Sequence, residues 1–172
     1  MHPCAATSFD KHPGGPSALL AELKALATST AQAGHTVAFG EFGLDYDRLH
    51  FTPRDQQLQY FELQLDLAVE LQLPLFLHCR AAAEDFERLV GARMGRLPRG
   101  GLVHSFTGTR EEMWRLVGMG LDVGVNGCSL KSEGNVEVVR EVPLGRLQIE
   151  TDGPWVSWSP LRGFSPGYFW WR

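Results

Sequence analysis

Five short apolar segments recur along the 172-residue chain, and helical patterns separate them. The segments occupy residues 36–46, 74–80, 100–106, 121–126 and 146–154. Strands that alternate with helices indicate a parallel sheet, because each parallel pair needs a crossover connection. Both an open doubly wound sheet and a closed eight-stranded barrel of the TIM type show this alternation. If the fold is the barrel, five strand signals in a chain shorter than about 200 residues predict that the barrel is incomplete.

The segments between the strands carry helix start signals. The spacing of leucines after Ser17 predicts a helix with Ser17 as its N-cap. Thr52 is expected to cap the next helix, and Thr109 with Glu112 forms the pattern of a capping box. Residues 1–16 are rich in turn formers and are expected to form a loop.

Acids and histidines follow the apolar runs, at Glu41, His78, His104 and Asp152. In a barrel the carboxyl ends of the strands meet at one mouth, which favours the barrel over the open sheet. Two histidines and two carboxylates are suitable ligands for Zn²⁺, Mn²⁺ or Mg²⁺. Any one of them alone is more often an ordinary rim residue, and the set of four in matching places is what indicates a metal centre.

The expected chemistry is hydrolysis by a metal-activated water. A bound divalent ion lowers the pKa of its water and polarises the bond under attack. Glu41 is expected to bridge two ions, His78 and His104 to bind one of them, and Asp152 to bind and also accept the proton of the attacking water. Glu41 and Asp152 are therefore the candidate catalytic residues. Arg80 is a candidate phosphate contact, with an ion pair to Glu84 as the simpler alternative.

Composition limits the possible partners and location. The net charge of −4 excludes a groove that holds nucleic acid by positive charge alone, so nucleic-acid chemistry would need metal ions. Three widely spaced cysteines are typical of free thiols in a reducing compartment. The sequence contains neither a secretory signal nor an apolar run long enough to span a membrane, so we expect a soluble intracellular protein.

The motifs G-E-x-G-L-D, L-H-C-R, V-H-S-F-T-G-T and E-T-D-x-P-W occur in this order between residues 40 and 155. Together they resemble the TatD family of metal-dependent deoxyribonucleases, within the amidohydrolase-like barrels. The resemblance implies DNA hydrolysis that depends on Mg²⁺ or Mn²⁺, including 3′–5′ exonuclease activity, with Zn²⁺ as a further option. It places Glu41, His78, His104 and Asp152 on the metal-ligand positions of the family. His2-Pro3 resembles a family motif that contacts substrate phosphate, and the eukaryotic branch favours a nuclear location.

The chain departs from the family pattern at both ends. The strands that precede the H-P motif, with their H-x-H metal pair, are missing, so residues 1–155 are expected to form a partial barrel with about strands 4–8. Residues 156–172 form a divergent tail that is rich in aromatic side chains. Two alternatives stay open: an amidohydrolase that acts on C–N or ester bonds, and a truncated isoform without catalytic activity.

Overall fold

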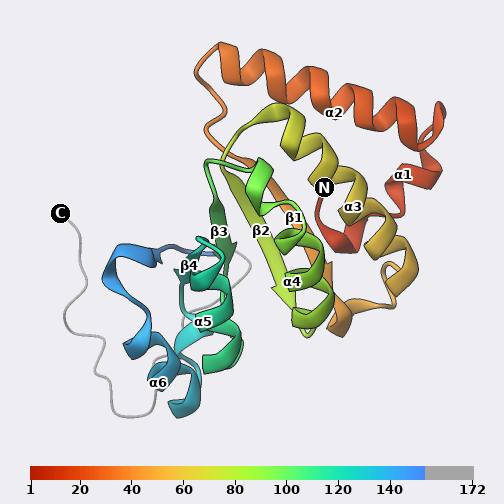
Figure 1. The fold of residues 1–172 in the computed structure, drawn as a ribbon. Helices are drawn as coiled ribbons and strands as arrows, with labels where there is room; N and C mark the ends of the chain where they lie inside the picture. Colours follow the sequence, from red (N-terminus) through yellow and green to blue (C-terminus); the bar gives the residue numbers. More distant parts are fainter. Residues whose placement is uncertain (154–172) are drawn as a thin grey trace.

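The computed structural model describes residues 1–153, and the expected tail at 156–172 lies outside them. Five parallel strands form one sheet in the order β1-β2-β3-β4-β5, so each strand pairs with the next strand in the sequence (Figure 1). Their bounds are β1 Phe39–Asp45, β2 Leu75–Arg80, β3 Gly101–His104, β4 Asp122–Val125 and β5 Leu147–Ile149. The parallel α/β fold with five strands is therefore confirmed. Within residues 1–153 the sheet is open, with β1 and β5 as its edges.

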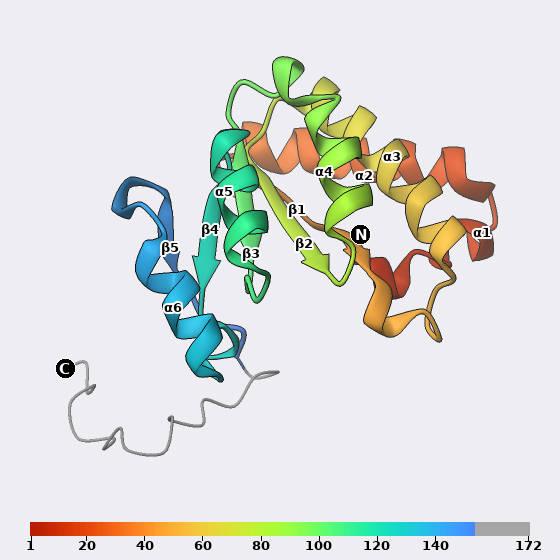
Figure 2. The same ribbon diagram turned by 60° about the horizontal axis from the view of Figure 1, so that its bottom comes forward.

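Helices connect the strands and cover one side of the sheet (Figures 1 and 2). Helix α3 packs on β1, α4 on β2 and α5 on β4, while α2 lies on α3 in an outer layer. The bounds are α1 Ser8–Lys11, α2 Gly15–Gln32, α3 Arg54–Leu71, α4 Ala83–Gly91, α5 Arg110–Gly118 and α6 Glu133–Glu141. Short 3₁₀ turns occupy Pro3–Ala5, Tyr46–Arg48, Met94–Arg96, Cys128–Leu130 and Leu144–Arg146. No helix among the described residues is long and apolar enough to cross a membrane.

The first 16 residues are not the loop that the turn formers indicated. They contain a 3₁₀ turn and α1, because the side chain of Phe9 is fully buried and stacks on Tyr60 with ring centroids 4.4 Å apart. Helix α2 begins at Gly15, so Ser17 lies inside its first turn and is not the N-cap. A buried aromatic contact that is distant in sequence thus orders a segment that local propensity leaves irregular.

The two other capping predictions have opposite outcomes. Thr109 and Glu112 form the capping box, with Thr109 N donating to Glu112 Oε2 at 2.7 Å and Glu112 N donating to Thr109 Oγ1 at 3.2 Å. Thr52 does not cap α3. Its hydroxyl is buried without a hydrogen-bond partner in the described part of the chain, and Pro53 occupies the cap position.

The core lies between the sheet and its helices. In β2 the side chains of Leu75 and Leu77 are almost completely buried among core residues. Because successive strand residues point to opposite faces, Phe76 and His78 lie on the other face of the sheet. This alternation separates the packed core from the face that carries the polar residues.

Candidate metal centre

Strands β2 and β3 place the two predicted histidines side by side. His78 and His104 are register partners in the parallel pairing, and both lie at or near the carboxyl end of their strands. They point to the same face of the sheet, because partners in register share their orientation. The expected convergence of these two residues is therefore present in the fold.

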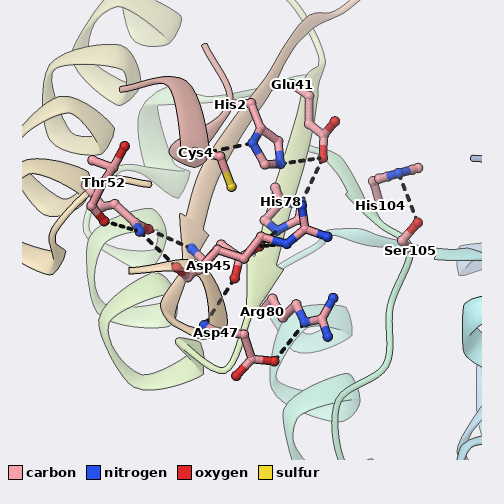
Figure 3. A network of polar contacts seen from close by, with 12 residues as sticks. His2, Cys4, Glu41, Asp45, Asp47, Thr52, His78, Arg80, His104 and Ser105 are labelled. Atoms are coloured by element: carbon pink, nitrogen blue, oxygen red, sulfur yellow. Dashed lines mark hydrogen bonds and ion pairs between the residues drawn. The ribbon is translucent and has the colours of Figure 1, made fainter. Parts of the chain in front are cut away.

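The apolar run 37–39 predicts a strand that ends before Glu41. In the structure Glu41 instead lies inside β1. The pairing of β1 with β2 shifts between Gly40 and Phe42, so Glu41 occupies a bulge. A bulge changes the direction in which a side chain points, and here the Glu41 carboxylate reaches His78 (Figure 3). At Gly43, with φ of 156°, a Cβ would lie only 1.8 Å from the carbonyl oxygen of His78, so glycine is required for this close approach.

His78 lies between two carboxylates. Its Nδ1 is 2.8 Å from Glu41 Oε1, and its Nε2 is 3.1 Å from Asp45 Oδ2 (Figure 3). Burial alone would lower the pKa of His78, but the hydrogen bonds to Asp45 and Glu41 outweigh it and raise that pKa above its ordinary value. Burial raises and His78 lowers the pKa of Glu41, and the net shift is downward. The ring and both acids thus stabilise one another in their charged forms.

His2 joins this cluster. Its ring meets the ring of His78 edge to face at 4.5 Å, and its Nε2 is 3.9 Å from Glu41 Oε1. The backbone nitrogen of Cys4 donates to His2 Nδ1 at 3.2 Å, which leaves Nε2 directed toward Glu41 (Figure 3). Ligand atoms of His2, Glu41 and His78 all lie within 4.8 Å of one another. His2, expected as a phosphate contact, therefore lies within reach of a metal ion held by this group.

His104 forms a second pair of contacts with acids. Its Nδ1 is 2.7 Å from Glu150 Oε2, and its Nε2 is 3.7 Å from Asp152 Oδ1. Burial lowers the pKa of His104, but the hydrogen bond to Glu150 and the nearby charge of Glu41 raise it overall. Asp152 is about one third exposed, at 33%, whereas His104 is buried at 7%. Asp152 is thus the member of this group with the most open access to solvent.

Arg80 pairs with Asp47 and not with Glu84, the alternative considered from the sequence. The Arg80 Nε donates to Asp47 Oδ2 at 2.8 Å, and both side chains are about half exposed (Figure 3). Arg80 also lines a cavity of about 550 Å³ between the loops after β2 and β3 and the start of α6. With Nε held by Asp47, the other guanidinium N–H groups have no hydrogen-bond partner among residues 1–153, and such groups are suited to bind an anion.

Sequence reasoning missed two acids of this centre, Asp45 and Glu150. Asp45 contacts Nε2 of His78, whose other nitrogen faces Glu41. Glu150 contacts Nδ1 of His104, whose other nitrogen faces Asp152. A signal was present, because Asp45 lies four residues after Glu41, and Glu150 lies two residues before Asp152. Both acids therefore lie close in sequence to a residue that was predicted as a ligand.

Comparison with known proteins gives a consistent result. A family model described as TatD related DNase matches residues 1–170. A curated relative from Schizosaccharomyces pombe, called Deoxyribonuclease Tat-D, is 54% identical over 160 residues, 93% of this chain and 51% of the relative. A relative from Pantoea, called 3'-5' ssDNA/RNA exonuclease TatD, is 41% identical over 84% of this chain and 56% of its own length. The chain thus spans about half the length of these curated relatives.

Solved structures show the same fold. The crystal structure of an uncharacterized amidohydrolase from Saccharomyces cerevisiae has a TM-score of 0.79 and 31% identity, and the match covers 92% of this chain and 56% of that one. A TatD family hydrolase from Entamoeba histolytica has a TM-score of 0.72 and 35% identity, over 88% of this chain and 48% of that one. Both structural matches therefore cover most of this chain.

Proposed function

This chain belongs to the TatD-related DNase family, and on that premise we propose that it is a metal-dependent DNA hydrolase of the 3′–5′ exonuclease type. Two imidazole–carboxylate contacts on neighbouring strands carry the proposal. His78 Nδ1 lies 2.8 Å from Glu41 Oε1, and His104, the register partner of His78, has its Nε2 3.7 Å from Asp152 Oδ1. A cluster of histidines and acids with shifted pKa values is typical of a functional site.

The donor set fits a divalent ion. Imidazole nitrogens and carboxylate oxygens are ligands for Mn²⁺ and Zn²⁺, and carboxylates suit Mg²⁺. We assign Glu41, His78, His104 and Asp152 as the metal ligands, and His2 lies close enough to Glu41 and His78 to join them. Mg²⁺ or Mn²⁺ is the proposed cofactor, with one or two ions, and such an ion would supply an activated water and polarise the phosphodiester.

Proton transfer and substrate binding are assigned to side chains of the protein. Asp152, at the open side of the centre, accepts the proton of the attacking water, and the carboxylate of Glu41 orients that water. Arg80 holds a phosphate of the DNA strand with the N–H groups that Asp47 leaves free. His2, whose Nε2 lies 3.9 Å from Glu41 Oε1, is assigned a contact with substrate phosphate.

We further propose that β1 to β5 correspond to about strands 4–8 of an eight-stranded barrel, and that residues 1–155 form one partial barrel domain. Two facts support this assignment: the sheet has open edges within residues 1–153, and the chain superposes on about half of longer relatives. The resemblance to eukaryotic members also supports a nuclear location, which localisation of a tagged chain would test.

The proposal is tested with the purified full chain and a 5′-labelled single DNA strand in Mn²⁺, Mg²⁺ or EDTA. A ladder that shortens from the 3′ end, and that disappears in EDTA and in Glu41→Gln and Asp152→Asn, is the expected result. The matched control is Asp66→Asn, which should retain activity. Asp66 is an exposed acid on α3, where it pairs with Arg93 and lies outside the proposed site. A folded chain without any DNA hydrolysis would instead support the non-catalytic alternative.

A further inference from the structure

His104 lies at the end of a chain of hydrogen bonds whose direction a backbone group fixes as far as Ser105. The backbone nitrogen of Cys128 can only donate, so its 2.8 Å hydrogen bond makes Asn126 Oδ1 the acceptor. Asn126 Nδ2 therefore faces Ser105 and donates to its hydroxyl oxygen. Ser105 Oγ lies 2.9 Å from His104 Nε2, and the hydroxyl can donate to that nitrogen or accept from it, according to the tautomer of the ring (Figure 3). The contact with Ser105 therefore adapts to the ring, and the tautomer is set on the other side of it.

The other ring nitrogen faces Glu150. Glu150 Oε1 accepts from the backbone nitrogen of Ser105 at 2.6 Å, and Oε2 lies 2.7 Å from His104 Nδ1. An ionised carboxylate has no hydrogen to donate, so Nδ1 must carry the hydrogen. The Glu150 carboxylate thus holds the hydrogen on Nδ1, and in the neutral ring the lone pair is then on Nε2, the nitrogen that faces Asp152.

We propose that Glu150 is a positioning residue that locks His104 in this tautomer and so presents the Nε2 lone pair to the metal. The inference rests on the proposed function and goes beyond it, because it names a residue that acts through His104. Carboxylates that hold the second nitrogen of a histidine ligand fix its orientation and raise its basicity.

Two backbone features are built around this carboxylate. Ser105 has φ of 51°, unusual for a residue other than glycine, and this conformation directs its N–H to Glu150. A Cβ at Gly124 would lie 2.4 Å from Glu150 Oε1, so glycine leaves the space that the carboxylate needs. The backbone thus both donates a hydrogen bond to the Glu150 carboxylate, after β3, and leaves space for it, in β4.

The decisive variant is Glu150→Gln, which keeps the shape of the side chain. The Ser105 N–H retains the amide oxygen, so the amide NH₂ faces His104 Nδ1 and donates to it. The ring hydrogen must then move to Nε2, where it blocks the lone pair. Glu70→Gln is the matched control, since Glu70 is exposed on α3 and pairs with Lys24.

The first readout is ¹⁵N NMR of the histidine rings in the metal-free full chain, at a pH where the shifts no longer change. The His104 signals are identified by their loss in His104→Asn. We expect hydrogen on Nδ1 in the unchanged chain and in Glu70→Gln, and on Nε2 in Glu150→Gln. Hydrogen that stays on Nδ1 in Glu150→Gln would overturn the proposal.

A second variant keeps the proposal testable where Glu150→Gln does not fold. Ser105→Gly removes the hydroxyl and suits the φ of 51°. Because Glu150 remains, the hydrogen is expected to stay on Nδ1. A hydrogen that moves to Nε2 in this variant would show that Ser105, and not Glu150, sets the tautomer.

The last readout is titration calorimetry with Mn²⁺. We expect Glu150→Gln to bind Mn²⁺ about 10- to 100-fold more weakly than the unchanged chain, and an equal Kd in the two would overturn the proposal. If the unchanged chain binds no Mn²⁺ and cuts no DNA, the proposed function fails, whereas the NMR readout still decides whether Glu150 sets the tautomer.

Discussion

Asp45 Oδ2 lies 3.1 Å from Nε2 of His78, across the imidazole ring from Glu41, whose Oε1 is 2.8 Å from Nδ1. Asp45 is almost fully buried, with 1% of its surface exposed, whereas Glu41 is half-buried. The two acids are thus distinguished by solvent access. Glu41 faces the open centre, and Asp45 holds the ring from inside the fold.

Asp45→Asn should weaken Mn²⁺ binding about 10- to 100-fold. Asp45 Oδ1 accepts from the Asp47 backbone nitrogen at 3.1 Å, so in the variant the amide oxygen stays there and the NH₂ faces His78. His78 must then carry its hydrogen on Nδ1, the nitrogen that faces Glu41. Titration calorimetry measures the change, with Asp66→Asn as control, and unchanged Mn²⁺ affinity in a folded Asp45→Asn chain would contradict this role.

Gly124→Ala should weaken Mn²⁺ binding and DNA hydrolysis together. The new methyl group would overlap Glu150 Oε1, so the carboxylate must move away from His104. Gly118→Ala is the matched control, because a Cβ there meets no atom within 4 Å. Activity assays and calorimetry on both variants test the idea, which fails if Gly124→Ala behaves like Gly118→Ala.

Arg80→Ala should raise the KM for DNA roughly 10- to 100-fold with little change in kcat, since a hydrogen bond to a charged group is worth about 1.5–3 kcal/mol. The reason is that Arg80 is held by Asp47, and we propose that it binds a substrate phosphate away from the reacting atoms. Arg88→Ala serves as control, because Arg88 pairs with Asp85 on α4. A fall in kcat at constant KM would instead place Arg80 at the reacting phosphate.

Asp85→Asn should lower the free energy of unfolding by about 1–3 kcal/mol at pH 7. Asp85 accepts hydrogen bonds from Tyr46 at 2.6 Å, Arg88 at 2.9 Å and Arg54 at 2.5 Å, and these lower its pKa to about 2. The folded pKa lies below the unfolded value of about 3.9. The stabilisation is therefore fully present above about pH 4 and is lost as the pH falls toward 2.

Urea unfolding of the unchanged chain and of Asp85→Asn at several pH values measures this dependence. The difference between the two chains should be largest at neutral pH and should shrink below pH 4. A difference that is constant from pH 7 to pH 2 would show that the Asp85 charge contributes nothing.

Mn²⁺ at about 100 times its Kd should stabilise the folded chain by roughly 2.7 kcal/mol, or about 5–10 °C in melting temperature for a chain of this size. The gain arises because the ion binds the folded state and has no assembled site in the unfolded chain. EDTA should reverse it, and Glu41→Gln should remove most of it. Thermal melts followed by circular dichroism provide the measurement, and equal shifts in Glu41→Gln would exclude Glu41 as a ligand.

Much of the fold was accessible from the sequence. The five strands follow from short apolar runs, and the capping box at Thr109 and Glu112 follows from two residues three apart. Both are local patterns, in which the chain neighbours of a residue dictate its conformation. The helix around Phe9 could not be predicted from the sequence, because the partner of Phe9, Tyr60, lies 51 residues away in sequence (60 minus 9).

The sequence by itself determined which polar residues follow the apolar runs, and so predicted Glu41, His78, His104 and Asp152 as one group. Only the tertiary structure decided their contacts: the bulge that turns Glu41 toward His78, and the acids Asp45 and Glu150 behind the two rings. The physical reason is that strand pairing fixes side chains that are distant in sequence to within a hydrogen bond of one another. Register and bulges, which set those distances, depend on the packing of the whole sheet.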